Sequence, residues 1–141
     1  MTYVLDACAI VALINEEAGA DAVQTLLDQA IDGDITLSMS IVNLIEVYYG
    51  FIGEQGATAA AAIIQQITAF PMHIIDTIPE QVFQEAARLK GAYNMSLADA
   101  IGLATAINLN GVFVTSDGEF EEPEAKEHAP VFWFRPPKEK K

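Results

Sequence analysis

Short apolar runs alternate with longer segments of helical periodicity along the chain. The apolar runs, which have the length of buried β-strands, lie at residues 3–5, 35–39, 72–75, 112–114 and 131–134. Apolar residues recurring every three or four positions predict helices over residues 7–16, 18–31, 41–51, 57–70, 79–93 and 97–109. Strands that alternate with helices are typical of an α/β fold, so we expect a mainly parallel central sheet of four or five strands.

Polar residues and glycines mark the ends of these elements. Ser40 is expected to cap the third helix, and Gly53 and Gly56 are expected to bracket the turn that follows it. The acidic segment 119–127 is expected to form a loop. The fifth predicted helix is expected to bury Phe83 on its inner face together with its other apolar residues.

Length and composition indicate one globular domain. The chain has 141 residues, of which 52% are hydrophobic, and we expect a domain over residues 1–135 followed by a short basic tail at 136–141. No apolar stretch is long enough to span a bilayer and no secretory signal is evident, so a cytoplasmic protein is expected. The single cysteine, Cys8, excludes an internal disulfide and a thiolate metal site. His73 and His128 are isolated, and neither is expected to be a ligand.

The net charge restricts the partners that the chain can take. Twenty acidic residues against seven basic ones give −13, and an acidic protein repels a phosphate backbone. Three of the seven basic residues lie in the last four positions. Arg88 and Lys90 are the best placed of the others, so they are the expected contacts if RNA is bound.

Glu46 is the acid whose position is not explained by a helix cap, a turn or the helix dipole. It lies in the middle of the helix predicted over residues 41–51, with apolar residues at most positions three and four away. Burying an unpaired carboxylate costs on the order of several kcal/mol unless it is paired or binds a metal. No Lys or Arg is near it in sequence. We therefore interpret Glu46 as a candidate metal ligand.

Three aspartates follow strands or begin helices, where they have ordinary structural explanations. Asp6 suits an N-cap, Asp99 fits a capping box with Ser96, and Asp117 with Gly118 is a common turn pair. The carboxyl ends of parallel strands lie at one edge of a sheet, however, so these aspartates are expected to meet there. Carboxylates without basic partners repel one another, and Mg²⁺ or Mn²⁺ would relieve that repulsion.

Four sequence segments carry a resemblance to a known family. They are residues 4–9 (Val-Leu-Asp-Ala-Cys-Ala), 42–47 (Val-Asn-Leu-Ile-Glu-Val), 96–100 (Ser-Leu-Ala-Asp-Ala) and 114–117 (Val-Thr-Ser-Asp). In this order and spacing, the chain resembles PIN-domain proteins of the kind found as the VapC toxin in bacterial VapBC toxin–antitoxin pairs. The resemblance implies a three-layer α/β/α domain around the parallel sheet.

The resemblance also implies an activity. The acids of the family fall on Asp6, Glu46, Asp99 and Asp117, which would bind Mg²⁺ (or Mn²⁺) and act as the catalytic residues. The implied function is a metal-dependent endoribonuclease that hydrolyses RNA phosphodiesters by metal-activated water. A cognate VapB-like antitoxin and a homodimer are the implied partners. Thr115 matches a hydroxyl often found near the metal.

Two departures keep other functions open. Cys8 stands where a Ser or Asn is usual, which removes a possible contact to a metal-bound water but none of the acids. The scarcity of basic residues favours an alternative in which the fold acts mainly as a protein-binding module. A DNA or structure-specific nuclease is the other alternative, because metal-activated water does not require a 2′-hydroxyl.

Overall fold

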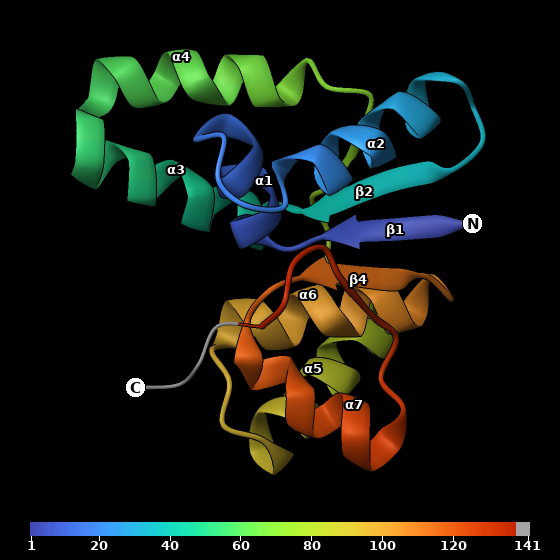
Figure 1. The fold of residues 1–141 in the computed structure, drawn as a ribbon. Helices are drawn as coiled ribbons and strands as arrows, with labels where there is room; N and C mark the ends of the chain where they lie inside the picture. The colour runs from blue at the N-terminus through green and yellow to red at the C-terminus, as the bar shows by residue number, and fades with distance from the viewer. Residues whose placement is uncertain (138–141) are drawn as a thin grey trace.

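Five parallel strands form the central sheet in the order β3-β2-β1-β4-β5. The strands are β1 (Thr2–Leu5), β2 (Thr36–Ser40), β3 (His73–Ile75), β4 (Val112–Thr115) and β5 (Val131–Trp133). The computed structural model describes residues 1–137 (Figure 1). It confirms the expected α/β fold with a parallel sheet.

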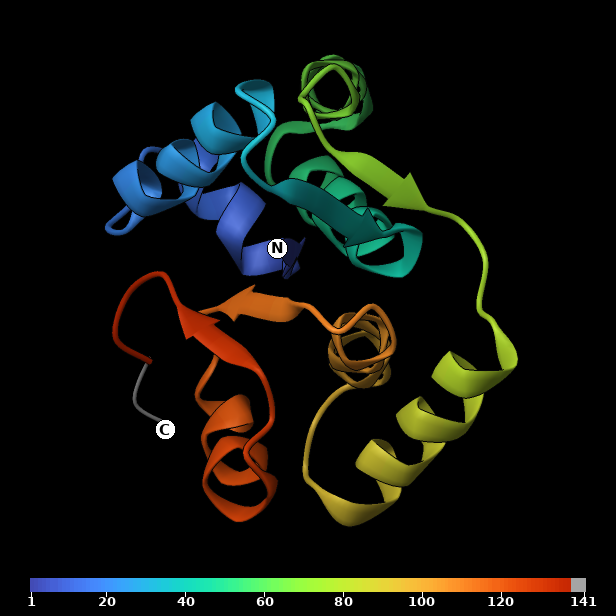
Figure 2. The ribbon, with the colours of Figure 1, turned by 90° about the vertical axis from the view of Figure 1, so that its right-hand side faces the viewer.

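Helices cover both faces of this sheet and give three layers (Figures 1 and 2). They are α1 (Ala7–Ile14), α2 (Ala20–Ile31), α3 (Ile41–Gln55), α4 (Ala57–Thr68), α5 (Glu80–Ala92), α6 (Leu97–Asn108) and α7 (Glu121–Glu127), with a 3₁₀ turn η1 (Gly118–Phe120) before α7. Helices α1, α2 and α4 lie on one side of the sheet, and α5 and α6 on the other. Helix α3 contacts both α1 and α6, so it links the two sides.

Alternation of side chains along the strands divides the core in two. Leu5 and Val114 face α1–α4, whereas the adjacent residues Val4 and Phe113 face α5 and α6. All four side chains are fully buried. Strands buried on both faces are continuously apolar, which is why these runs could be recognised in the sequence.

The chain changes direction across the sheet at β1. Strand β1 pairs with β2 on one side and with β4 on the other, and Leu5 lies opposite Val114. In open parallel sheets, a crevice forms beyond the carboxyl ends of the strands at such a switch point. The residues that follow β1 and β4 therefore enter the same crevice.

Two of the expected elements are wrong. Gly53 lies inside α3, which continues to Gln55 and ends at Gly56, where φ is +88°. The exposed Gly53 costs the helix little, so it does not end it. The acidic segment 119–127 is not a loop, because most of it forms α7. Acids in the first turn of α7 interact favourably with the helix dipole.

Helix α5 buries a narrower face than expected. Val82, Ala86 and Leu89 follow helical spacing and are buried, as expected, but Phe83 is 62% exposed and the expectation for it is wrong.

The expected N-cap of α3 is confirmed, since the Ser40 hydroxyl accepts the Val42 N–H at 3.2 Å. Of the predicted basic tail at 136–141, residues 138–141 lie outside the described part of the chain. Within residues 1–137, no helix has the length and apolar character needed to cross a membrane.

Helix α6 approaches its neighbours closely at Gly102. A Cβ atom there would lie 2.7 Å from the Asn43 side-chain oxygen and 2.7 Å from a ring carbon of Phe113. Asn43 is fully buried on α3 and donates through Nδ2 to the Ala98 carbonyl at 3.4 Å. The position of α6 against α3 and β4 therefore requires glycine at this position.

A pair of glycine substitutions tests this packing. Gly102→Ala should lower the free energy of unfolding by about 1–3 kcal/mol, because the added methyl group overpacks the contact with Asn43 and Phe113. Gly53→Ala, also inside a helix but with no atom within 4 Å, should raise it by about 0.5–1 kcal/mol. Chemical denaturation measures both values. A Gly102→Ala protein as stable as the Gly53→Ala protein would contradict the proposed close approach.

Candidate active site

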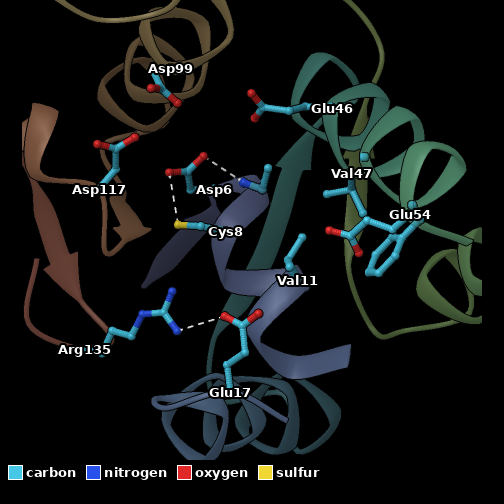
Figure 3. Close-up of a pocket in the computed structure, with 13 residues that line it drawn as sticks. Asp6, Cys8, Val11, Glu17, Glu46, Val47, Glu54, Asp99, Asp117 and Arg135 are labelled. Atoms are coloured by element: carbon cyan, nitrogen blue, oxygen red, sulfur yellow. Dashed lines mark hydrogen bonds and ion pairs between the residues drawn. The ribbon is translucent and has the colours of Figure 1, made fainter. Parts of the chain in front are cut away.

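The crevice beyond the strands is an acidic pocket with a volume of about 320 Å³. The carboxylates that line it belong to Asp6, Glu17, Glu46, Glu54, Asp99 and Asp117. All four acids singled out in the sequence are thus in one pocket, contributed by segments far apart in the chain. Figure 3 shows Asp6 at the centre, with Asp99, Asp117 and Glu46 around it.

Asp6 is fixed by the end of β1 and the start of α1. It is 2% exposed, and its backbone N–H donates to the Val114 carbonyl at 2.9 Å, continuing the pairing of β1 with β4. One carboxylate oxygen accepts the Ala7 N–H at 2.8 Å, so Asp6 is the N-cap of α1 as expected. The other accepts the Thr115 hydroxyl at 2.7 Å and the Cys8 thiol at 3.4 Å.

Thr115 joins Asp6 to Asp117. Its hydroxyl donates to Asp6 and accepts the backbone N–H of Asp117 at 3.0 Å. The Asp117 carboxylate then accepts the Glu119 N–H at 3.0 Å and caps η1. The end of β4 therefore holds two carboxyl groups, one by a side-chain bond and one by a backbone bond.

Glu46 and Asp99 reach the pocket from α3 and α6. Asp99 is 6% exposed in the first turn of α6, and its N–H donates to the Ser96 hydroxyl at 3.1 Å, which is one half of the expected capping box. Glu46 is partly buried, as expected. Asn43, one turn before Glu46, bonds the Ala98 carbonyl just before Asp99 and so fixes the two acids relative to each other.

The oxygen atoms of these acids lie close enough together to become ligands of one small cation. One oxygen each from Asp6, Glu46 and Asp99 lie within 4.8 Å of one another, and the same holds for Asp99, Asp117 and Glu119. Ligands of Mg²⁺ at about 2.1 Å from the ion lie at most about 4.2 Å apart, so small side-chain movements bring either set into range. All-oxygen carboxylate sets suit hard divalent cations.

Burial and mutual repulsion favour protonated carboxyl groups in the pocket. Burial raises the pKa of Asp6 to about 6, although the hydrogen bonds from Thr115 and Cys8 act in the opposite direction. Burial, followed by the negative charge of Asp6, raises the pKa of Asp99 to about 9. Burial also raises the pKa of Glu46. Near neutral pH, the pocket therefore holds protons that a cation would displace.

Glu119 and Arg135 of this region were not anticipated from the sequence. Glu119 follows Asp117 in η1, and its Oε2 atom is buried without a hydrogen-bond partner in the described part of the chain. Arg135 lines the pocket from beyond β5, and its Nη1 atom pairs with Glu17 at 3.1 Å. The rule applied to β1 and β4 also applies to β5, so the residues after β5 were a usable signal for Arg135.

The cations proposed to contact RNA lie elsewhere. Arg88 and Lys90 are on α5 and do not line the acidic pocket. Arg88 pairs with Glu85 and with Glu127, so its charge is already offset. Contact of either residue with RNA stays a prediction.

Burial, together with the charge of Asp6, raises the pKa of the Cys8 thiol to about 12, so Cys8 remains a neutral donor.

The raised pKa values predict how stability varies with pH in the metal-free protein. Asp99 has a pKa of about 9 in the fold and an ordinary value of 3.8, and Asp6 changes from 3.8 to about 6. The folded state therefore binds more protons, and this contribution to stability is complete below about pH 4 and lost as the pH rises toward 9. In EDTA, the melting temperature should fall between about pH 5 and pH 9.

Substitutions identify the group responsible for that fall. Asp99→Asn should flatten the pH dependence, because the amide does not ionise, whereas Asp21→Asn on the exposed face of α2 should leave it unchanged. Thermal melts at several pH values provide the measurement. Equal slopes for Asp99→Asn and wild type would show that Asp99 does not hold the proton.

Comparisons with known proteins agree with this architecture. A family model of the PIN domain matches residues 3–126. The chain is similar in structure to VapBC2 from Rickettsia felis bound to a promoter DNA fragment, with a TM-score of 0.74 and 19% identity, covering 94% of this chain and 98% of that chain. DNA-bound VapBC from Salmonella typhimurium gives a TM-score of 0.70 and 16% identity, with 96% and 99% covered. The Mycobacterium tuberculosis toxin VapC20 is described as cleaving the sarcin–ricin loop. Its structure gives a TM-score of 0.63 and 14% identity, covering 86% of this chain and 94% of that chain.

No curated protein sequence matches the chain. The identities to the solved structures are low, so those structures establish the fold only. The family match covers most of the sequence, including all four acids at the carboxyl edge of the sheet and the residues that follow Asp117. The order of strands, the layers and the match over residues 3–126 agree, and the chain belongs to the PIN domain family.

Proposed function

We propose that this protein is a Mg²⁺- or Mn²⁺-dependent endoribonuclease, the toxin of a type II toxin–antitoxin pair. The observation that supports the proposal most strongly is the acidic pocket itself. Carboxylates from the ends of β1 and β4 and from α3 and α6 meet there, with oxygen atoms spaced for a hard cation. Structural packing explains the positions of Asp6 and Asp117, but it does not explain Glu46 inside an apolar helix.

Each residue of the pocket has a distinct task in this proposal. Asp6, Glu46 and Asp99 would hold the cation, and Asp117 would complete the site beside Asp99. When bound, the ion would activate a water molecule and offset charge on the phosphate. Thr115 would keep the Asp6 carboxylate oriented through its 2.7 Å hydrogen bond.

The composition of the pocket argues against a metal-free mechanism. A ribonuclease that uses the 2′-hydroxyl of its substrate needs an acid–base pair, most often histidines. His73 and His128 do not line the acidic pocket. We therefore expect hydrolysis by water, which leaves a 5′-phosphate and a 3′-hydroxyl.

The structural relatives support the choice of substrate and partner. VapC20 is described as a toxin that cleaves the sarcin–ricin loop, and several of the other similar structures are VapBC complexes. We extend to this chain an RNA substrate, a VapB-like antitoxin and a cytoplasmic location. Arg88 and Lys90 stay candidates for RNA contacts outside the pocket.

The charge of the chain favours one alternative function. A net charge of −13 opposes binding of any nucleic acid and fits a protein-binding module that retains the fold. Such a module would need neither the cation nor an intact set of acids. The cleavage experiment below separates the two functions, and a DNA substrate in parallel tests for a DNA or structure-specific nuclease.

The protein should cleave single-stranded RNA in the presence of Mg²⁺ or Mn²⁺ and lose all activity in EDTA. Glu46→Gln should lower the rate at least about a hundredfold, because it removes a charged ligand. Glu54→Gln is the matched control, since Glu54 lines the pocket but lies outside both sets of clustered oxygens. Gel analysis gives the rates, and end-labelling identifies the products. A 2′,3′-cyclic phosphate as the direct product, or cleavage in EDTA, would refute the proposal.

A homodimer is the second partner that we propose, and an exposed apolar stripe on α3 supports it. Ile45, Tyr49 and Ile52 are 56%, 61% and 42% exposed and lie on one face of the helix. Tyr49→Arg should shift the protein from dimer to monomer in light scattering, because it places a charge in the contact. Ile31→Arg, at a 67% exposed residue of α2, should not. Dimers of equal stability in both variants would exclude the α3 stripe as the contact.

A further inference from the structure

Arg135 is the one cation that lines the acidic pocket in the described part of the chain. It follows β5 and is rigidly held, with 11% of its side chain exposed. Its Nε donates to the Ser116 hydroxyl at 3.2 Å, and its Nη1 donates to the Ala18 carbonyl at 2.9 Å and to Glu17 at 3.1 Å. The guanidinium carbon also lies 5.1 Å from the centre of the Phe134 ring.

These contacts leave one part of the guanidinium group unused. Nη2 has no hydrogen-bond partner among residues 1–137. Figure 3 shows Arg135 between Cys8 and Glu17, with its guanidinium group directed into the pocket. An arginine that served only to tie the chain after β5 to the α1–α2 connection would not need to present free N–H groups to a cavity.

Arg135 is also connected to the central carboxylate. The Ser116 hydroxyl that accepts from Arg135 donates to the Cys8 sulfur at 3.7 Å, and the Cys8 thiol donates to Asp6. The guanidinium group is thus three hydrogen bonds away from Asp6. It lies beside the clustered acids without contacting them, which leaves them available to a cation.

The pocket needs a positive group to accept a nucleic-acid strand. Six carboxylates line it, and a phosphodiester entering it would be repelled even after one cation is bound. A guanidinium group binds phosphate oxygens well, because its N–H groups are fixed in a plane and remain charged. Glu17, which pairs with Arg135 at 3.1 Å, would compete with such a phosphate.

We propose that Arg135 binds, through Nη2, a backbone phosphate of the substrate strand next to the bond that is cleaved, and that Glu17 weakens this contact. The inference rests on the proposed nuclease function and adds a substrate-binding residue to it. It also accounts for how so acidic a chain holds nucleic acid. One preorganised cation lies where the strand enters, in place of a basic surface.

Binding of a fluorescein-labelled single-stranded RNA tests the proposal. Fluorescence anisotropy is measured at several salt concentrations with Ca²⁺ present, and gels confirm that the RNA stays intact. Arg135→Gln should weaken binding about tenfold and lower the slope of log K against log salt by about one. Arg135→Lys keeps the charge without the planar fork and should show an intermediate loss.

Glu17→Gln is the matched control. It removes the same ion pair as Arg135→Gln but leaves the cation in place and removes an acid from the pocket. It should bind the RNA more tightly than wild type. If Arg135 only stabilises the fold, the two variants should lose binding and thermal stability together, and that result would overturn the proposal.

Neutral methylphosphonate groups locate the contact. Each phosphate of the RNA is replaced in turn, and one replacement next to the cleavage site should weaken binding to wild type about tenfold. The same replacement should not weaken binding to Arg135→Gln any further, because the substitution and the methylphosphonate remove the same interaction. Additive losses at every position would overturn the proposal.

Different results would overturn the phosphate contact of Arg135 and the proposed nuclease function. One outcome overturns only the phosphate contact. It is RNA that is cleaved with Mg²⁺ or Mn²⁺, while each methylphosphonate weakens binding to wild type and to Arg135→Gln by the same factor. RNA that binds with the expected coupling and is not cleaved supports the contact and refutes the nuclease function. A wild-type protein that does not bind RNA at all overturns the contact as well.

Discussion

Repulsion among carboxylates at one edge of the sheet is the constraint on which the site depends. The acids cannot move apart, because several of them also stabilise the fold. Asp6 caps α1, Asp117 caps η1, and the Ser96 hydroxyl fixes the backbone at Asp99. Only protons or cations can therefore relieve the repulsion. The fold holds these acids rigidly in place, and it does so with the ordinary caps of its helices.

The framework and the four acids could be predicted because they follow local rules. Buried parallel strands are continuously apolar, and the residues after them reach a common edge, which located Asp6 and Asp117. Glu46 was recognised because a lone acid in an apolar helix is costly. Gly53 and Phe83 were misassigned because a single exposed glycine or phenylalanine costs little, so sequence pattern alone does not decide their environment.

Long-range contacts explain what could not be predicted. Arg135 is positioned by Glu17, Ser116 and the Ala18 carbonyl, which are distant from it in sequence. Gly102 was not singled out, because its role depends on the side chains of Asn43 and Phe113. Among residues 1–137, Arg135 is the one cation that lines the pocket, so general attraction of the pocket to a phosphate backbone is weak.

The central place of β1 in the sheet has a consequence for synthesis of the protein. Asp6 leaves the ribosome well before its partner Thr115, which is 109 residues later in the chain. At about 5–20 residues per second, β1 waits several seconds or longer for β4. The nascent chain therefore cannot assemble the pocket until nearly all of the domain has emerged. A nuclease built in this way would be silent while it is translated.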